Sequence, residues 1–222
     1  MNRLIVALGL VTTLTTLPPA FAADEYSAAE QRVFIDNHMK NVAKETTVEY
    51  RYVQTGKPED GFEDAVKLVV GKGAADKRTL AVEYLSGKRK MDLPSIDGAT
   101  GNPVILYFLE DDIRAMHDRL GGQQAYFRKR IRLALADAAT VKPVKLSYRG
   151  TNVDGSEVTI EPYVNDALKD RFGAFASKVY VFTMSDAVPG GVYEIRTRVE
   201  ASTGSTTTPA VTTSMKIVDT KP

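Results

Sequence analysis

The residues best suited to chemistry in this chain are two histidines and one acidic triplet. His38 and His117 each lack a second metal-type ligand three or four residues away, the spacing that places two ligands on one helix face. We therefore interpret both as ordinary histidines rather than as metal ligands. In Glu110-Asp111-Asp112, successive side chains on a helix would point about 100° apart, so we expect a solvated face that pairs with Arg114.

Covalent and cofactor chemistry find little support in the sequence. The chain contains no cysteine, which excludes disulfides, thiolate catalysis, iron–sulfur clusters and cysteine-based zinc sites. No serine lies in a G-x-S-x-G elbow. We therefore expect no cofactor and no metal. A catalytic site assembled from scattered residues stays open as an alternative.

Charge is nearly balanced, with 29 Lys and Arg against 28 Asp and Glu, so we expect no nucleic-acid partner. The one concentrated basic segment lies between apolar residues at four-residue spacing, on a predicted helix from Gln123 to about Ala138. This segment permits two interpretations, a solvated face or a surface that contacts anionic lipid or an envelope protein. Its residues are Arg128, Lys129, Arg130 and Arg132.

A second helix is predicted from Asn102, which can cap it, through Pro103 at its first position to the stop at Gly121-Gly122. Its apolar residues recur at helical spacing, which predicts one buried face. That face is either ordinary core or the lining of a hydrophobic cavity, because the two look identical in a sequence. The candidate ligand-binding residues are Ile105, Phe108, Leu109, Ile113, Met116, Leu120 and Phe127.

Residues 1–22 have the features of a cleavable secretory signal. Arg3 precedes an apolar run that is too short and too threonine-rich to favour a membrane anchor, and Ala20-Phe21-Ala22 fits signal peptidase. We expect the mature chain, residues 23–222, to form one domain. The style of the signal suggests a bacterial periplasm, and the absence of cysteine excludes a lipoprotein anchor.

Alternating and helical patterns place the remaining elements. Ser27 and Glu30 have capping-box spacing and predict a helix with Ile35, Met39 and Val42 inward. Period-two alternation and turn residues predict strands on both sides of the central helices, the first carrying Val48, Tyr50 and Tyr52 on one face, and a short helix is predicted over 164–175. The predicted strands are 47–54, 62–70, 78–85, 141–148, 156–162, 178–184, 192–201 and 211–218.

This order predicts an α+β fold, with one curved antiparallel sheet of seven to nine strands, open or half a barrel, and helices packed on its concave face. The order, with the meander that begins Val48-Glu49-Tyr50-Arg51-Tyr52, resembles that of the LolA and LolB lipoprotein carriers and related periplasmic domains. The resemblance implies an acyl-chain cavity and a soluble, LolA-like form, because the anchoring cysteine of LolB is missing.

The function expected from these observations is a non-catalytic periplasmic protein that binds or carries a hydrophobic small molecule, an acyl chain or an acylated partner. Transient contact with a membrane or an envelope protein would accompany it. Two alternatives stay open. One is an envelope accessory protein that acts through a protein interface, and the other is a cofactor-free enzyme with a dispersed site.

Overall fold

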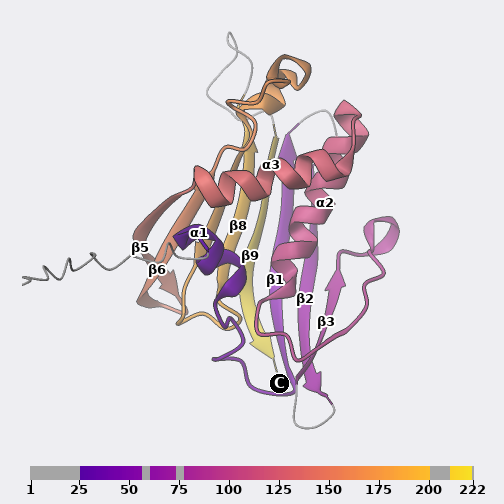
Figure 1. The fold of residues 1–222 in the computed structure, drawn as a ribbon. Coiled ribbons are helices and arrows are strands. Elements are labelled where there is room, and N and C mark those ends of the chain that lie inside the picture. The colour runs from indigo at the N-terminus through magenta and orange to yellow at the C-terminus, as the bar shows by residue number, and fades with distance from the viewer. Residues whose placement is uncertain (1–25, 57–60, 74–77, 201–210, 222) are drawn as a thin grey trace, which may run out of the picture.

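The computed structural model describes residues 26–56, 61–73, 78–200 and 211–221. The predicted signal, residues 1–22, lies outside the described residues. Helices and turns occupy one side of a single large sheet (Figure 1). The strands are β1 (Thr46–Gly56), β2 (Phe62–Lys72), β3 (Arg78–Tyr84), β4 (Ile96–Asp97), β5 (Thr140–Tyr148), β6 (Thr151–Ile160), β7 (Val179–Met184), β8 (Val192–Val199) and β9 (Val211–Lys221).

All neighbouring strands pair antiparallel, in the order β4-β3-β2-β1-β9-β8-β7-β6-β5. The sheet is open, because β4 and β5 form separate edges. The predicted α+β class with one antiparallel sheet and helices over its concave face is therefore confirmed. The last strand, β9, lies between β1 and β8 and joins the two meanders into one sheet.

Alternating side chains explain why the first meander packs as it does. Val48, Tyr50 and Tyr52 of β1 are buried, as predicted, while Arg51 faces solvent and pairs with Glu63 of β2. Their neighbours in β2 and β3 alternate in register, so the inward residues of three strands form one continuous apolar face.

Two long helices, α2 (Pro103–Leu120) and α3 (Gln124–Asp137), lie on the inward side of the sheet, α2 against the first meander and α3 against β6 of the second. Figure 1 shows α2 running along the strands while α3 crosses them. The Asn102 side chain accepts from the Val104 N–H, which confirms the predicted cap, and α2 ends at Gly121 with a φ of 67°. In the described ranges, no helix combines the length and apolar character needed to cross a membrane.

The N-terminal helix is shorter than predicted. The capping box of Ser27 and Glu30 is present, but α1 (Ala28–Glu30) passes into the wider turn η1 (Gln31–Ile35) and ends there. The N–H of Asp36 donates to the Gln31 carbonyl five residues back, which changes the phase of the helix. Val33 is consequently buried and Ile35 exposed, so the predicted inward position of Ile35 is wrong.

The turn of the β5–β6 hairpin was also misplaced. The predicted strands 141–148 and 156–162 leave residues 152–155, Asn-Val-Asp-Gly, to the connection between them, but these residues pair with β5 as part of β6. The chain reverses instead at Arg149 and Gly150, whose φ values are 49° and 76°. Two consecutive positive φ values match the twist of a two-residue hairpin, which explains why this short loop is favoured over the longer one.

The segment 164–175 forms turns instead of the predicted short α-helix. Its regular parts are the 3-10 turns η4 (Lys169–Arg171) and η5 (Gly173–Ser177). Gly173, the first residue of η5, adopts a φ of 52°, and a left-handed residue interrupts a right-handed helix. The short 3-10 turn η3 (Gly87–Arg89) lies in the connection after β3.

His38 joins three segments that are distant in sequence. Its Nδ1 accepts from the backbone N–H of Asn102 at 3.1 Å, so the neutral ring carries its proton on Nε2 and donates to the Arg32 carbonyl at 3.0 Å. The Asn102 amide group in turn donates to the Gly190 carbonyl and to the Tyr50 hydroxyl. This buried cluster fixes where α2 begins.

We predict that this cluster makes the fold sensitive to mild acid. Burial lowers the pKa of His38 below its ordinary 6.5, so the unfolded chain binds a proton that the folded chain resists. The free energy of unfolding, measured in urea, should therefore fall from about pH 7.5 to about pH 5.5. His38→Asn should be less stable at the higher pH but should lose much of this fall. Equal wild-type stability at both pH values would contradict the prediction.

Candidate ligand-binding site

The predicted ligand-binding residues form most of the layer between α2 and the sheet. Six of the seven are at most 5% exposed and belong to one apolar core with the inward face of β1 to β3. Ring contacts join this layer across the elements, as between Phe108 of α2 and Tyr52 of β1, whose centroids lie 6.2 Å apart. The six are Ile105, Phe108, Leu109, Ile113, Met116 and Phe127, and Leu120 packs against them with part of its surface exposed.

The core reaches the surface at the C-terminal end of α2. An opening of about 190 Å³, here called the turn pocket, lies between the α2–α3 turn and η4. It brings together Leu120 and Phe127, both predicted ligand-binding residues. The pocket is lined by Leu120, Gly121, Gly122, Gln123, Tyr126, Phe127, Leu168, Arg171 and Phe172.

A second opening lies at the N-terminal end of α2. This cap pocket has a volume of about 360 Å³ and is almost wholly apolar. Leu106, on its rim, is 52% exposed. The pocket is lined by Val33, Phe34, Ile96, Ala99, Gly101, Asn102, Pro103 and Leu106.

Aromatic rings build the inner wall of the turn pocket. Phe127 lies 6.0 Å from Phe172 and 6.1 Å from Tyr126, measured between ring centroids. Tyr163 stands behind them, 5.6 Å from Phe172. Edge and tilted ring contacts of this kind stabilise by more than their buried area alone, so the wall is already formed without a ligand.

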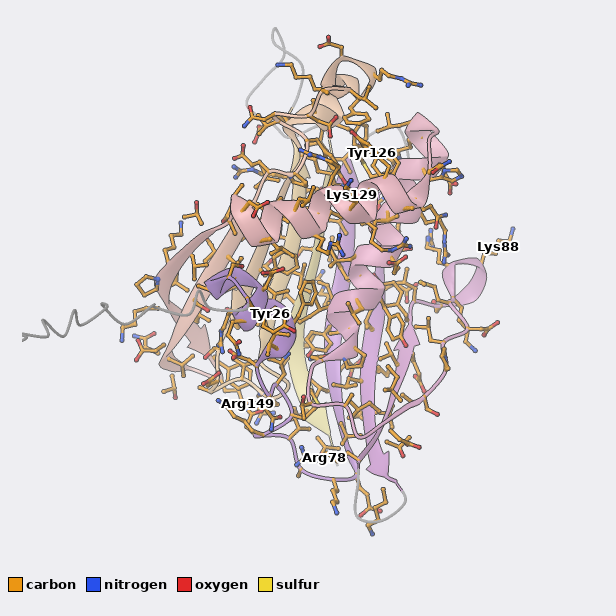
Figure 2. All side chains as sticks on the ribbon, viewed as in Figure 1. Tyr26, Arg78, Lys88, Tyr126, Lys129 and Arg149 are labelled. Atoms are coloured by element: carbon orange, nitrogen blue, oxygen red, sulfur yellow. The ribbon has the colours of Figure 1, made fainter. Side chains whose placement is uncertain are left out.

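A buried carboxylate holds the segment carrying η4 against α3. Asp166, whose side chain is 1% exposed, lies 2.7 Å from Nε of Arg130 and accepts from the Tyr126 hydroxyl at 2.6 Å. The Leu168 N–H donates to the same carboxylate. The Arg130 guanidinium forms an ion pair with Asp166 and donates its hydrogen bonds to the Pro162 carbonyl. Tyr126, labelled in Figure 2, therefore belongs both to the pocket and to its anchor.

The acidic triplet bonds across elements, and the expected solvated face paired with Arg114 is wrong. Glu110 makes two hydrogen bonds with Arg128 of α3. Asp111 accepts from the Tyr52 hydroxyl at 3.2 Å, and burial raises the pKa of its carboxyl group. The carboxyl groups of Asp111 and Asp112 lie partly buried between α2 and the strands, where the hydroxyl groups of Tyr52 and Tyr180 reach them.

Asp112 forms the most buried ion pair under α2. Lys178 bonds to one of its carboxylate oxygens, and the Tyr180 hydroxyl donates to the other at 2.6 Å. The side chains of Lys178 and Asp112 are only 6% and 10% exposed. Burial, followed by the charge of Asp112, raises the pKa of Tyr180 well above its ordinary value. This cluster connects the middle of α2 to the start of β7.

The basic segment divides into two pairs. Arg128 and Arg130 are held by Glu110 and Asp166, as described above. Lys129 and Arg132 are exposed, and within the described ranges neither forms an ion pair. Figure 2 labels Lys129 on α3. With Ala125 and Arg128 they line a shallow depression on the outer side of α3. The part of the segment that is free to meet an anionic surface is therefore smaller than the sequence suggests.

The two histidines do not meet. Both ring nitrogens of His38 form hydrogen bonds in the cluster at the start of α2. His117 lies near the C-terminal end of the same helix, where its Nδ1 is 2.7 Å from the Gly122 carbonyl oxygen. Three or more His, Asp or Glu side chains arranged to hold a metal do not occur in the part of the chain that the structure describes.

Sequence reasoning missed Asp166, Leu168 and Arg171 as pocket-forming residues. They lie about forty positions beyond the α2–α3 turn, and only the return of the chain after β6 brings them to it. The available signal was Tyr163-Val164, Leu168 and Phe172, an apolar series in a segment rich in charge. That series indicates a turn packed on one side but does not say against what.

Comparison of the sequence with protein-family models and with curated proteins gives no match. Two solved structures are similar over most of the chain. One is the Mycobacterium tuberculosis lipoprotein LppX, with 8% identity, 86% of this chain and 92% of that chain covered, and a TM-score of 0.37. The other is a LolA superfamily protein from Nitrosomonas europaea, with 7% identity, 87% and 92% covered, and a TM-score of 0.24. Both similarities are distant. The second structure belongs to the LolA superfamily, the group that the order of elements in the sequence resembles.

We predict that breaking the pair beneath α2 destabilises the fold. Lys178→Met leaves the Asp112 carboxylate buried without its cation, which should cost about 3–5 kcal/mol. The double variant Lys178→Met/Asp112→Asn removes both charges and should recover much of that loss. Urea unfolding measures both effects, and Lys169→Met, at an exposed lysine of η4, serves as the control. A Lys178→Met variant as stable as the control would show that the pair contributes nothing.

Proposed function

We propose that this protein binds and carries a hydrophobic ligand and performs no catalysis of its own. The observation that supports this most directly is that the buried apolar face of α2 opens to the surface through an apolar pocket at each end of the helix. An apolar opening that continues into a core is a place where a ligand chain can replace water without breaking hydrogen bonds.

The pockets differ in what they can hold. Ligand sites commonly measure about 300–1,000 Å³. The cap pocket falls in that range at about 360 Å³, and the turn pocket, at about 190 Å³, falls below it. The turn pocket therefore takes one part of a ligand, against Leu120 and Phe127. A longer chain would have to part the packed side chains of Leu109, Ile113 and Met116.

A second candidate function, a protein interface, is favoured by the exposure of Leu106 beside the cap pocket. Ile35, next to the pocket residue Phe34, is also 42% exposed. Exposed aliphatic side chains around an apolar hollow are typical of a surface that another protein covers. On this alternative the cap pocket would receive a partner's side chain, and the turn pocket alone would serve the ligand.

A neutral apolar fluorophore, N-phenyl-1-naphthylamine, tests the ligand proposal. The wild-type protein should enhance its fluorescence, and Leu168→Arg should weaken binding by at least about tenfold, because a charge at the rim must be desolvated when the probe enters. Leu168 is 39% exposed, so the variant is expected to fold. Unchanged far-UV circular dichroism would verify this.

Val141→Arg provides the matched control, since Val141 is 40% exposed but lies on the edge strand β5. It should bind the probe as the wild type does. Leu106→Arg reports on the cap pocket separately. No enhancement by the wild type, or equal binding by both pocket variants and the control, would refute the ligand proposal.

We also propose that the protein works in the periplasm, where Lys129 and Arg132 could meet an anionic membrane surface. Support for export comes from the Arg3 apolar run and Ala20-Phe21-Ala22, which lie outside the described residues. Cleavage after Ala22 predicts a mature N-terminus of Ala-Asp-Glu-Tyr. N-terminal sequencing of the expressed protein checks this, and recovery of the full-length chain from the cytoplasm would contradict it.

A further inference from the structure

The turn pocket has one charged residue in its lining. Eight of its nine lining residues are apolar, aromatic, glycine or amide, and the ninth is Arg171, an exposed residue at the end of η4. An apolar interior with one cation in its lining is complementary to an amphiphile, because the apolar tail and the charged head group prefer these two environments.

The Arg171 guanidinium is available for a ligand. Among the described residues, no carboxylate forms an ion pair with it, whereas Arg128 and Arg130 of α3 are each paired with an acid. The planar guanidinium group of arginine has several donors and forms bidentate hydrogen bonds with carboxylate or phosphate oxygens. An unpaired arginine at a pocket mouth therefore complements an anionic head group.

The buried acid of the pocket wall does not compete for that role. Asp166 is already neutralised by Arg130, and it accepts from Tyr126 and from the Leu168 N–H at 2.7 Å. The nearest acids along the chain, Asp118 and Asp170, are exposed and do not line the pocket. Solvent screens them, so the charge presented at the mouth remains positive.

The walls of the pocket are held in place before any ligand arrives. The Asp166–Arg130 pair ties the segment carrying η4 to α3, and the rings of Phe127 and Phe172 are in contact. At Gly121 an added Cβ would meet nothing within 4 Å, so the chain leaves the mouth open on the α2 side. The helix α3 begins at this mouth, and its N-cap residue Gln123 makes no side-chain capping hydrogen bond. The free N–H groups of the first turn of α3 therefore add partial positive charge to the mouth that Arg171 lines.

We infer that the turn pocket binds a single-chain amphiphile with an anionic head group, a carboxylate or a phosphate, with its tail against Phe127 and Phe172 and its head on Arg171. The inference rests on the proposed function and names the class of ligand. The small volume favours one alkyl chain over two.

Titration calorimetry with dodecanoate, dodecyl phosphate and dodecanol, below their aggregation concentrations and with the carboxylate ionised, tests the inference directly. The wild type should bind at least one of the anions about tenfold or more tightly than the alcohol, because a charge-assisted hydrogen bond is stronger than a neutral one. The preferred anion identifies the head group. Added salt should reduce the preference, since the head lies at an exposed mouth.

Arg171→Gln should abolish the preference for the anion, because its affinity for the anions should fall about tenfold or more and its affinity for dodecanol much less. Lys169→Gln, in the same turn but outside the pocket lining, should keep the preference. Equal affinity of the wild type for alcohol and anions, or a preference that survives Arg171→Gln, would overturn the inference while the neutral probe still supports the carrier. Failure of the wild type to bind any of these molecules would overturn both.

Discussion

Burial of the apolar face of α2 against the sheet is the interaction on which the rest of this structure depends. Each large aliphatic or aromatic side chain removed from water contributes roughly 1.5–3 kcal/mol, against about 1 kcal/mol for a typical hydrogen bond. Six such side chains lie in this layer from α2 and α3. Hydrophobic burial therefore holds α2 against the sheet, and the polar groups around the helix have to adapt.

That adaptation explains the buried charges beneath the helix. A helix pressed into a curved sheet cannot keep every polar position in water, and Asp111 and Asp112 fall inside the contact. Each then needs a donor, which Tyr52 supplies to the first and Lys178 and Tyr180 supply to the second. Such pairs add little net stability over apolar residues, but they accept only one placement of the helix on the strands. These pairs therefore specify the position of α2 along and across the strands, which hydrophobic burial alone does not fix.

The two ends of α2 are where this packing stops, and both candidate pockets follow from that. At the start, the cluster of His38 and Asn102 fixes the first turn and leaves Leu106 beyond the edge of the core. At the other end, Gly121 stops the helix before the sheet is fully covered, and the segment from Tyr163 to Phe172 returns to close part of the gap. Arg171 stands at the remaining opening because Asp166 anchors the same segment to α3. The pocket and its charge are thus consequences of one helix stop and one buried ion pair.

The sequence by itself determined the local elements and their inward faces. Period-two alternation located Val48, Tyr50 and Tyr52, helical spacing located the face of α2, and Asn102 with Pro103 located its start, since these signals depend only on neighbouring residues. Local patterns did not locate the β5–β6 turn or the end of the first helix. The first depends on left-handed backbone at Arg149 and Gly150, and the second on the wide helical turn η1. Only the tertiary structure decided that β9 lies beside β1, that Asp112 meets Lys178, and that Arg171 faces Leu120 and Phe127. These pairs are separated by tens to more than a hundred residues, and nothing in local propensity says which distant segments will share one buried surface.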